Sequence, residues 1–352
     1  MTLSSLARLA GATLLAGGLL TGAASAQSIN WDMQSTYPSS LKQLGSLGVR
    51  IEEQLKTVSG GQINVKFQEP GAIVPALEAF DAVASGAVQA AWSTPGYWIG
   101  KEPALALFAA VPFGPSAGEY LAWMKFGGGQ QLMDEVYAKH GIKSLVCGLI
   151  APEASGWFRK EIKSVDDLKG LKMRFFGLGA QVMNKMGVST QLLAGGDIFP
   201  ALELGTIDAT EFSMPAIDLN LGFYQVAKHY YLPGWHQQTT LFDLMMNKDE
   251  WDGLSDQQKA IFQTVCDANL AYGFAEGEAI QFSALKEIES KGVTIHRWSP
   301  EILKALKAAW DEVIAEQTKN ETFAKVWASL SEFRENYRSW GDRGYLRAGD
   351  LD

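Results

Sequence analysis

Apolar and polar positions follow one another along the chain in patterns that predict strands and helices in alternation. Residues 63–68 (INVKFQ) alternate strictly, which is typical of a half-buried strand. The other elements predicted in this part of the chain are strands at Ser28–Gln34 and Ala90–Trp92, a helix from about Ser39 to Val58, and a helix after Pro75. Strands that alternate with helices indicate an α/β fold with a largely parallel sheet.

The same alternation returns after Ser155. Strands are predicted in the segments SGWFRK, LKMRFF and VTIHRW, with helices from Leu178 and beyond GGDIF. Ser255 is a good N-cap for a helix whose apolar positions continue toward Glu289, more than 30 residues and long enough to lie across two domains. The chain after Trp298 is predicted to be helical to about Trp340. We therefore expect two α/β domains: residues 27–151 with about 238–275, and residues 152–237 with about 276–352, including the C-terminal helices.

A sequence pattern that occurs twice suggests that the two domains resemble each other. Pro75-Ala-Leu-Glu and Pro200-Ala-Leu-Glu are each predicted to open a helix that leads into a short strand. Ligands of α/β sheets bind beyond the carboxyl ends of the strands. Those ends are Trp92–Tyr97 in one half and Glu211–Ser213 in the other, so both are expected to line one interdomain cleft.

The first 26 residues have the layout of a secretory signal peptide. Arg8 precedes an apolar stretch from Leu9 to about Leu20, and Ala24-Ser25-Ala26 supplies small residues at the cleavage positions. The stretch is interrupted by glycines and is too short for a spanning helix. We expect cleavage after Ala26 and a mature protein in the periplasm.

Composition narrows the class of function. The 352 residues include 30 Lys and Arg against 39 Asp and Glu, a net charge of −9 that argues against a nucleic-acid binder. Two cysteines cannot form a disulfide framework, and the four histidines show no metal-ligand spacing. Cys147 lies in a predicted strand and Cys266 in a predicted helix; a disulfide or two buried thiols would fit, and we favour the thiols.

Three charged residues are candidates for a site. Arg174 lies in an apolar strand and could bind a carboxylate with its guanidinium, or pair with a structural acid. Glu211 ends a strand among apolar residues, where a carboxylate needs a cation or several hydrogen bonds. Glu153 lies at the entry to the second half, and could equally be a solvated loop acid. Two neighbouring carboxylates would repel unless Arg174 or a hard cation such as Na⁺ or Ca²⁺ lay between them.

Motifs for catalysis are absent from the sequence. It contains no GxSxG elbow, no GxxxxGK[ST] loop and no evident Cys/His dyad, and Gly177-Leu-Gly179 lacks the third glycine of a dinucleotide site. The aromatic residues that could wall a ligand pocket are Trp98, Trp157, Phe212, Tyr231 and Trp235.

Several segments resemble the extracytoplasmic solute receptors of tripartite ATP-independent periplasmic (TRAP) transporters. The similarity spans about Ser28 to Tyr345 and is clearest in ALEAFDAVASGAVQAA, GYWIGKEPA, AVPFG, SGWFRKEI, DLKGLKMRFFGLGAQVM, GGDIFPALELGTIDATEF and YYLPGW. It is closest to the branch that binds small 2-oxo monocarboxylates such as pyruvate. The resemblance implies a periplasmic-binding-protein fold with two α/β domains, a hinge and a long helix touching both.

The resemblance also implies roles for individual residues. Arg174 would clamp the substrate carboxylate, and Tyr97 would contact the substrate. A bridging cation would be coordinated by Glu211, by the backbone of Phe212 and by Glu153. Glu153 stands where a neutral, glutamine-like ligand is expected, which favours a divalent ion. Phe212 stands where tryptophan is expected, which leaves the size of the substrate open.

These observations predict a periplasmic receptor that captures a small organic acid anion, a 2-oxo or 2-hydroxy monocarboxylate, and delivers it to TRAP membrane subunits. Arg174, Glu153, Tyr97, Phe212 and Trp235 are the predicted substrate contacts, and the cofactor is Na⁺ or Ca²⁺. The alternatives are a secreted metal-dependent enzyme with a closing cleft and an orphan or sensor receptor. The apolar and aromatic content of Phe323–Trp340 permits a homodimer through the C-terminal helix.

Overall fold

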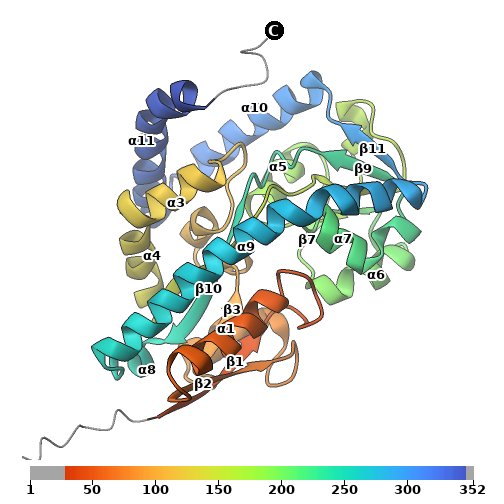
Figure 1. Cartoon of the computed structure of the whole chain (residues 1–352). Helices are drawn as coiled ribbons and strands as arrows, with labels where there is room; N and C mark the ends of the chain where they lie inside the picture. Colours follow the sequence, from red (N-terminus) through yellow and green to blue (C-terminus); the bar gives the residue numbers. More distant parts are fainter. Residues whose placement is uncertain (1–27, 346–352) are drawn as a thin grey trace, which may run out of the picture.

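The computed structural model describes residues 28–345 and places them in two sheets with helices packed around each (Figure 1). The predicted signal peptide lies outside these residues. No helix among residues 28–345 is long and apolar enough to cross a membrane. The α/β class predicted from the sequence is confirmed.

The first sheet has the strand order β2-β1-β3-β10-β4. Its parallel strands end at the boundary with the second sheet, and only β10, which begins there, runs antiparallel to its neighbours. The strands are β1 (Ile29–Ser35), β2 (Ile63–Gln68), β3 (Ala90–Ser93), β4 (Ile142–Ile150) and β10 (Thr240–Asn247). The helices around them are α1 (Ser46–Val58), α2 (Ala79–Ala84), α3 (Ala117–Phe126), α4 (Gly129–Ala138) and α8 (Lys248–Asp252), with 3₁₀ turns η1 (Ala76–Glu78), η2 (Pro95–Trp98) and η3 (Pro103–Phe108).

The second sheet has the strand order β11-β9-β5-β8-β6-β7, and here β5 is the strand that runs antiparallel to both of its neighbours. Its strands are β5 (Gly156–Phe158), β6 (Lys172–Arg174), β7 (Ser189–Gln191), β8 (Ala209–Thr210), β9 (His229–Leu232) and β11 (Thr294–Arg297). The helices are α5 (Gly177–Lys185), α6 (Gly195–Glu203), α7 (Pro215–Leu221) and α10 (Pro300–Gln317), with η4 (Val165–Leu168) and η5 (Phe223–Gln225). Both sheets thus contain more antiparallel pairing than predicted. The chain passes from β4 in the first sheet to β5 in the second, and from β9 in the second to β10 in the first, and β5 and β10 run opposite to their neighbours.

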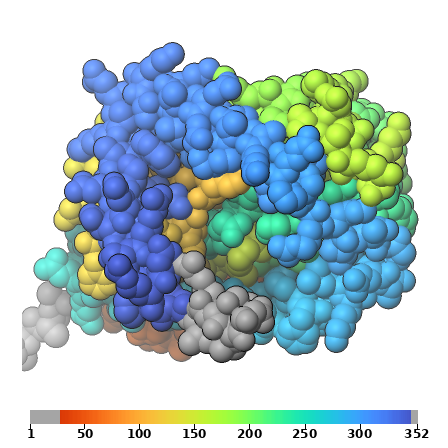
Figure 2. All heavy atoms as spheres, turned by 90° about the horizontal axis from the view of Figure 1, so that it is seen from above, coloured from red at the N-terminus to blue at the C-terminus, as the bar shows by residue number. Residues whose placement is uncertain are grey.

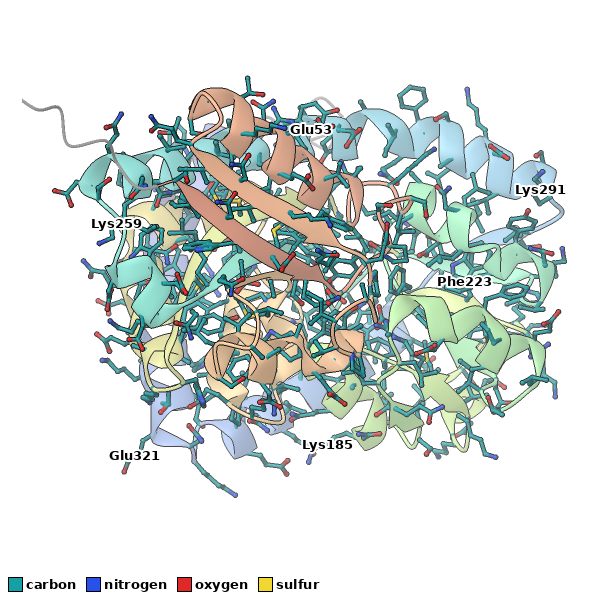
Figure 3. The ribbon with its side chains drawn as sticks, turned by 90° about the horizontal axis from the view of Figure 1, so that it is seen from below. Glu53, Lys185, Phe223, Lys259, Lys291 and Glu321 are labelled. Atoms are coloured by element: carbon teal, nitrogen blue, oxygen red, sulfur yellow. A yellow bond between two sulfur atoms is a disulfide. The ribbon has the colours of Figure 1, made fainter. Side chains whose placement is uncertain are left out.

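Helix α9 (Asp256–Ser290) joins the two halves. Its 35 residues begin at the predicted cap, where Ser255 accepts a hydrogen bond from the backbone N–H of Gln258. The helix packs against β4 and α1 near its start and against α7 near its end. Lys259 and Lys291, close to its two ends, lie on opposite sides of the molecule (Figure 3). The predicted length of more than 30 residues is confirmed.

Two predicted helix starts are wrong. Helix α1 begins at Ser46 rather than Ser39, because the chain first makes a tight turn in which Gln43 has a φ of 59° and a Cβ on Gly45 would lie 1.8 Å from the carbonyl oxygen of Pro38. Pro200 lies inside α6 instead of opening it. That helix already starts at Gly195, and the acidic Asp197 in its first turn suits the positive end of the helix dipole.

The cysteines form a disulfide between β4 and α9, so the expectation of two free thiols is wrong. The Cα atoms of Cys147 and Cys266 lie 4.1 Å apart although 119 residues separate them in sequence. The helix packs directly on the strand, and this long-range contact is invisible in the local pattern. The export expected from the sequence would bring the chain into an oxidising environment, which favours the bond.

The C-terminal helix α11 (Glu321–Gly344) packs against η3, α3 and α4, elements of the first half. Figure 2 shows this dark-blue helix along one side of the molecule, next to α10. The predicted division into two domains, with the C-terminal helices in the second, stays a prediction.

Candidate functional site

Polar residues from both sheets meet in a small cavity where the strands of each sheet end. The cavity measures about 20 Å³ and is lined by Tyr37, Leu44, Thr94, Tyr97, Glu153, Arg174, Phe176, Phe212, Ser213, Gln237, Thr240 and Phe242. A wider, open groove of about 560 Å³ lies by Ser28 and Asp249, but it lacks buried charged groups. The two strand ends named from the sequence, at 92–97 and 211–213, therefore do reach one site.

Arg174 occupies the carboxyl end of β6 and is only 1% exposed. Its Nη1 donates hydrogen bonds to Glu211 Oε1 at 2.6 Å and to the Glu211 carbonyl oxygen at 2.8 Å, while Nε donates to the carbonyl oxygen of Leu193. The guanidinium also lies 5.2 Å from the centre of the Phe212 ring. Arg174 is thus paired with an acid, yet its Nη2 has no hydrogen-bond partner within residues 28–345 and is available to a second carboxylate.

Glu211 follows β8 and is fully buried. Its Oε1 accepts the bond from Arg174, whereas Oε2 accepts no hydrogen bond from any described residue. His236 Nε2 lies 3.4 Å from Oε2, without hydrogen-bond geometry. Burial acts to raise the pKa of Glu211, but Arg174 and His236 outweigh it and lower that pKa. Glu211 is therefore a charged carboxylate with one oxygen facing the site.

Glu153 lies between β4 and β5, where the chain first passes from one sheet to the other, and is 2% exposed. Its Oε1 accepts hydrogen bonds from Gln237 Nε2 at 3.0 Å and Thr240 Oγ1 at 2.9 Å, while Oε2 is buried without a partner in the described chain. Burial, and then the charge of Glu211, raise the pKa of Glu153. A nearby cation would remove this penalty on its charged form. The reading of Glu153 as a solvated loop acid is wrong.

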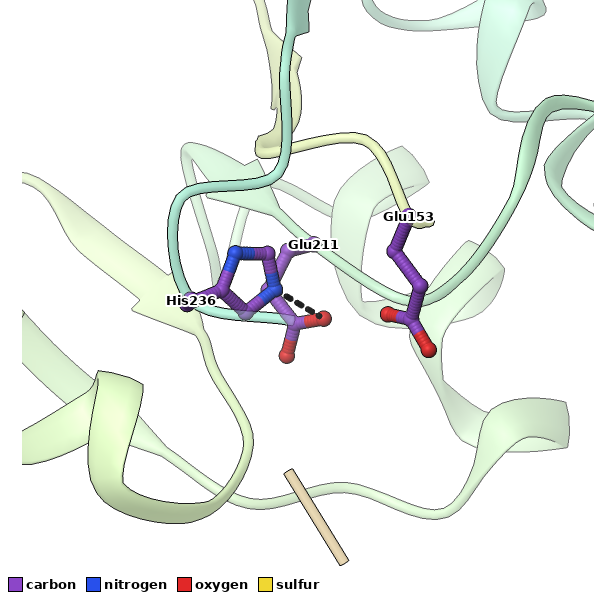
Figure 4. A group of neighbouring side chains, drawn as sticks. All are labelled: Glu153, Glu211 and His236. Atoms are coloured by element: carbon purple, nitrogen blue, oxygen red, sulfur yellow. Dashed lines mark ion pairs between the residues drawn. The ribbon is translucent and has the colours of Figure 1, made fainter. Parts of the chain in front are cut away.

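Two carboxylates and an imidazole meet at one point of the site. Atoms of Glu153, Glu211 and His236 lie within 4.8 Å of one another (Figure 4). Two opposed Ca–O bonds span about 4.6–5.2 Å, so the spacing suits Ca²⁺ or the similarly coordinated Na⁺. Both ring nitrogens of His236, and further oxygens of Ser213 and Gln237, are buried without hydrogen-bond partners in residues 28–345. The oxygens in this group fit a hard cation, and buried polar atoms without partners need a ligand or ordered water.

The carbonyl oxygen of Phe212 is a further available ligand. No described residue donates a hydrogen bond to it, whereas the neighbouring carbonyl oxygens of Glu211 and Ser213 both accept such bonds. The Phe212 side chain lines the cavity, as does Tyr97, which is 8% exposed and packs edge-on against Phe176. The sequence placed both residues at the site, and the structure locates them there.

Trp235 is placed differently from the other predicted contacts. Its ring lies 5.7 Å from that of Phe113 and 6.0 Å from that of Phe175, and it does not line the cavity. The carbonyl oxygen of Trp235 accepts a hydrogen bond from the backbone N–H of Phe113. Trp235 therefore holds the loop after β9 against the first half, and it is the next residue, His236, that lies beside Glu153 and Glu211.

Sequence reasoning missed His236, Tyr37, Gln237 and Thr240. Tyr37 follows the carboxyl end of β1, so the rule that identified Tyr97 after β3 could also have found it. His236 and Gln237 lie in a loop beyond β9, and Thr240 starts an antiparallel strand. Neither position carries a motif, which is why these side chains emerge only from the packing of the two sheets.

Comparisons with known proteins agree with this architecture. The profile of DctP, the bacterial extracellular solute-binding proteins of family 7, matches residues 35–321. The monocarboxylate 2-oxoacid-binding periplasmic protein of Nostoc sp. (strain PCC 7120) is 35% identical over 315 residues, 89% of this chain and 86% of its own length.

Solved structures give the same picture. A TRAP solute-binding protein from Pseudoalteromonas atlantica, with bound sodium and pyruvate, has a TM-score of 0.87 and 32% identity over 92% of this chain and 99% of its own. One from Bordetella bronchiseptica, a mixed-occupancy dimer with calcium and picolinate in its bound site, has a TM-score of 0.87 and 33% identity over 89% and 94%. With a family profile and relatives that span nearly its whole length, this chain belongs to the DctP family of bacterial extracellular solute-binding proteins.

Proposed function

We propose that this chain is a TRAP transporter receptor that captures a small 2-oxo or 2-hydroxy monocarboxylate, such as pyruvate, together with Na⁺ or Ca²⁺. The observation that carries the proposal is the buried cluster of Glu153, Glu211 and His236 beside Arg174, with oxygens that lack partners in the described chain. Relatives about one-third identical bind pyruvate with sodium or with calcium.

The roles of the residues follow from their atoms. Arg174 Nη2 would donate to the substrate carboxylate, while Nη1 stays on Glu211. Glu153, Glu211 and the carbonyl oxygen of Phe212 would hold the cation, which supplies positive charge next to the substrate, while His236 lies beside Glu211. Tyr97 and the Phe212 ring would contact the rest of the acid. Because all of these groups are at least 92% buried, their interactions with an anion are little screened by water.

The proposal extends to location and partners. Export would follow from cleavage after Ala26, and membrane subunits of a TRAP transporter would receive the bound acid. A dimer like that of the Bordetella relative would use the C-terminal helix α11. We propose a binding role rather than catalysis, because the site offers ligands for both an anion and a cation.

Calorimetric titration of chelator-treated protein with pyruvate, in the presence and absence of Ca²⁺ or Na⁺, tests the function. We expect tight binding only with a cation present, and recovery of the acid chemically unchanged. Arg174→Ala should lose at least tenfold in affinity, whereas Lys172→Ala, on the exposed end of the same strand, should not. Turnover of the acid would favour the secreted enzyme, and wild-type affinity in Arg174→Ala would remove the clamp.

A further inference from the structure

Asp218 is a buried acid that lies behind the site and has no role in the proposed contacts. It is 1% exposed and lies in α7. Its Oδ2 accepts hydrogen bonds from Trp157 Nε1 at 2.9 Å and from the Tyr230 hydroxyl at 3.0 Å, and its Oδ1 accepts one from the backbone N–H of Ser213 at 3.0 Å. All three donors are neutral, so a costly buried carboxylate is held here without a paired cation.

The bond to Ser213 holds one end of the segment that bears the cation ligands. The carbonyl oxygen of Ser213 accepts a hydrogen bond from the backbone N–H of Ala154, next to Glu153. At the other end, the backbone N–H of Glu211 donates to the carbonyl oxygen of Arg174, and Arg174 donates back to Glu211. Phe212, between these two anchors, forms no backbone hydrogen bond with described residues. The direction of its carbonyl oxygen is therefore set by how its neighbours are held.

We propose that Asp218 is a positioning residue that, by holding the backbone of Ser213, aims the Phe212 carbonyl oxygen and the Glu211 carboxylate at a common cation. The inference rests on the proposed function, because it concerns the same ion. Groups that orient metal ligands typically change metal affinity 10- to 100-fold when they are replaced.

Replacing Asp218 by asparagine places an NH₂ group opposite one of the hydrogen-bond donors that now bond to the carboxylate. With its oxygen toward Trp157 and Tyr230, the amide keeps two bonds but turns its NH₂ toward the N–H of Ser213, and the segment loses its anchor. With its oxygen toward Ser213, the NH₂ meets the indole N–H of Trp157, which can only donate. Either orientation keeps two hydrogen bonds at most and sets two donors against each other, so Asp218→Asn should weaken the hold on Ser213.

Removal of the indole N–H should resolve the conflict. In Trp157→Phe/Asp218→Asn the amide oxygen can accept from Ser213, while the NH₂ donates to the Tyr230 hydroxyl oxygen. The double variant restores the anchor without restoring the charge of Asp218. It therefore separates a positioning role from simple electrostatic attraction of the ion.

The experiment is a titration of the chelator-treated mature protein with Ca²⁺ or Na⁺ by calorimetry and with Tb³⁺ by sensitised luminescence, in saturating pyruvate. We expect Asp218→Asn to weaken ion binding 10- to 100-fold, and both Trp157→Phe and the double variant to stay within about threefold of wild type. Thermal unfolding of each variant shows that it is folded and reports any general loss of stability separately from affinity.

Asp243 provides a matched control in the other sheet. It is fully buried on β10 and accepts hydrogen bonds from the Tyr137 hydroxyl at 2.7 Å and from Ser144 Oγ at 2.6 Å, but it holds no ligand-bearing segment. Asp243→Asn should leave ion affinity unchanged.

The outcomes divide as follows. Wild-type affinity in Asp218→Asn, or a double variant as weak as Asp218→Asn, overturns the positioning role while leaving the proposed function intact. Equal losses in Asp218→Asn and Asp243→Asn also overturn it, because they would reflect general disturbance. A wild-type protein that binds neither Ca²⁺ nor Na⁺ in saturating pyruvate removes the proposed function and this inference together.

Discussion

Replacing Glu153 by glutamine removes one of the two carboxylates at the site while it keeps the size and shape of the side chain. The charged groups that face the cluster are Glu153 and Glu211, both negative, and Arg174, which is positive. A monocarboxylate adds one negative charge. A divalent ion then brings the sum to zero, whereas a monovalent ion leaves one negative charge. In Glu153→Gln the balance is reversed, and the monovalent ion gives the neutral site.

The size of the effect follows from the distances. Two unit charges about 4 Å apart interact by about 4 kcal/mol at an effective dielectric constant of about 20. Ca²⁺ carries one more unit of charge than Na⁺, so the variant should lose about that much more binding energy for Ca²⁺. Allowing for reorganisation of the site, we expect the ratio of Ca²⁺ to Na⁺ affinity to fall by at least about 100-fold.

Calorimetry of chelator-treated wild type and Glu153→Gln with each ion, in saturating pyruvate, measures this ratio. Glu161→Gln is the control, since that acid lies just after β5, is 42% exposed and does not line the cavity. An unchanged ratio in Glu153→Gln would show that its carboxylate does not face the ion.

Three other predictions follow from the structure. Arg174→Lys should weaken pyruvate binding at least tenfold with little change in thermal stability, because an ammonium group cannot replace the separate N–H groups on Glu211 and the substrate; calorimetry and thermal unfolding together test this. Cys147→Ala/Cys266→Ala should lower the free energy of unfolding by about 2–5 kcal/mol, since the bond closes a loop of about 120 residues; an unchanged urea midpoint would contradict it. Burial raises the pKa of Asp243 to about 7 from an ordinary value of 3.8, so its contribution to stability is complete below about pH 3.8 and is lost as pH rises through about 7. Asp243→Asn, which mimics the protonated form, should therefore gain stability relative to wild type between pH 5 and pH 8. A difference between the urea midpoints of the two proteins that stays constant over this pH range would refute this.

The parts of the fold that local pattern controls were predictable. Strand β2 matches the alternating segment exactly in its bounds, and the Ser255 cap located the start of α9, because both depend on residues close in sequence. The antiparallel direction of β10 and the disulfide between β4 and α9 depend on contacts across more than 100 residues, and nothing in their own segments signals them.

The candidate site divides in the same way. Arg174 and Glu211 stand out in sequence because a charge at the end of an apolar strand needs a partner. His236 and Asp218 do not, since a histidine in a loop and an acid in the first turn of a helix are ordinary on a protein surface. Their importance arises from burial, which the neighbouring sheet and helices impose.

The disulfide at Cys266 fixes one point of helix α9 on the first sheet, so any change in the direction of the helix produces a displacement that grows with distance from that point. The bond ties the helix to β4, and 24 residues continue beyond it to Ser290, an arm of about 36 Å at 1.5 Å per residue. A tilt of about 5° about Cys266 would move the end of the helix at Ser290 by about 3 Å. Since α7, which carries Asp218, packs on this arm, small changes of angle near the first sheet translate into ångström-scale displacements beside the second.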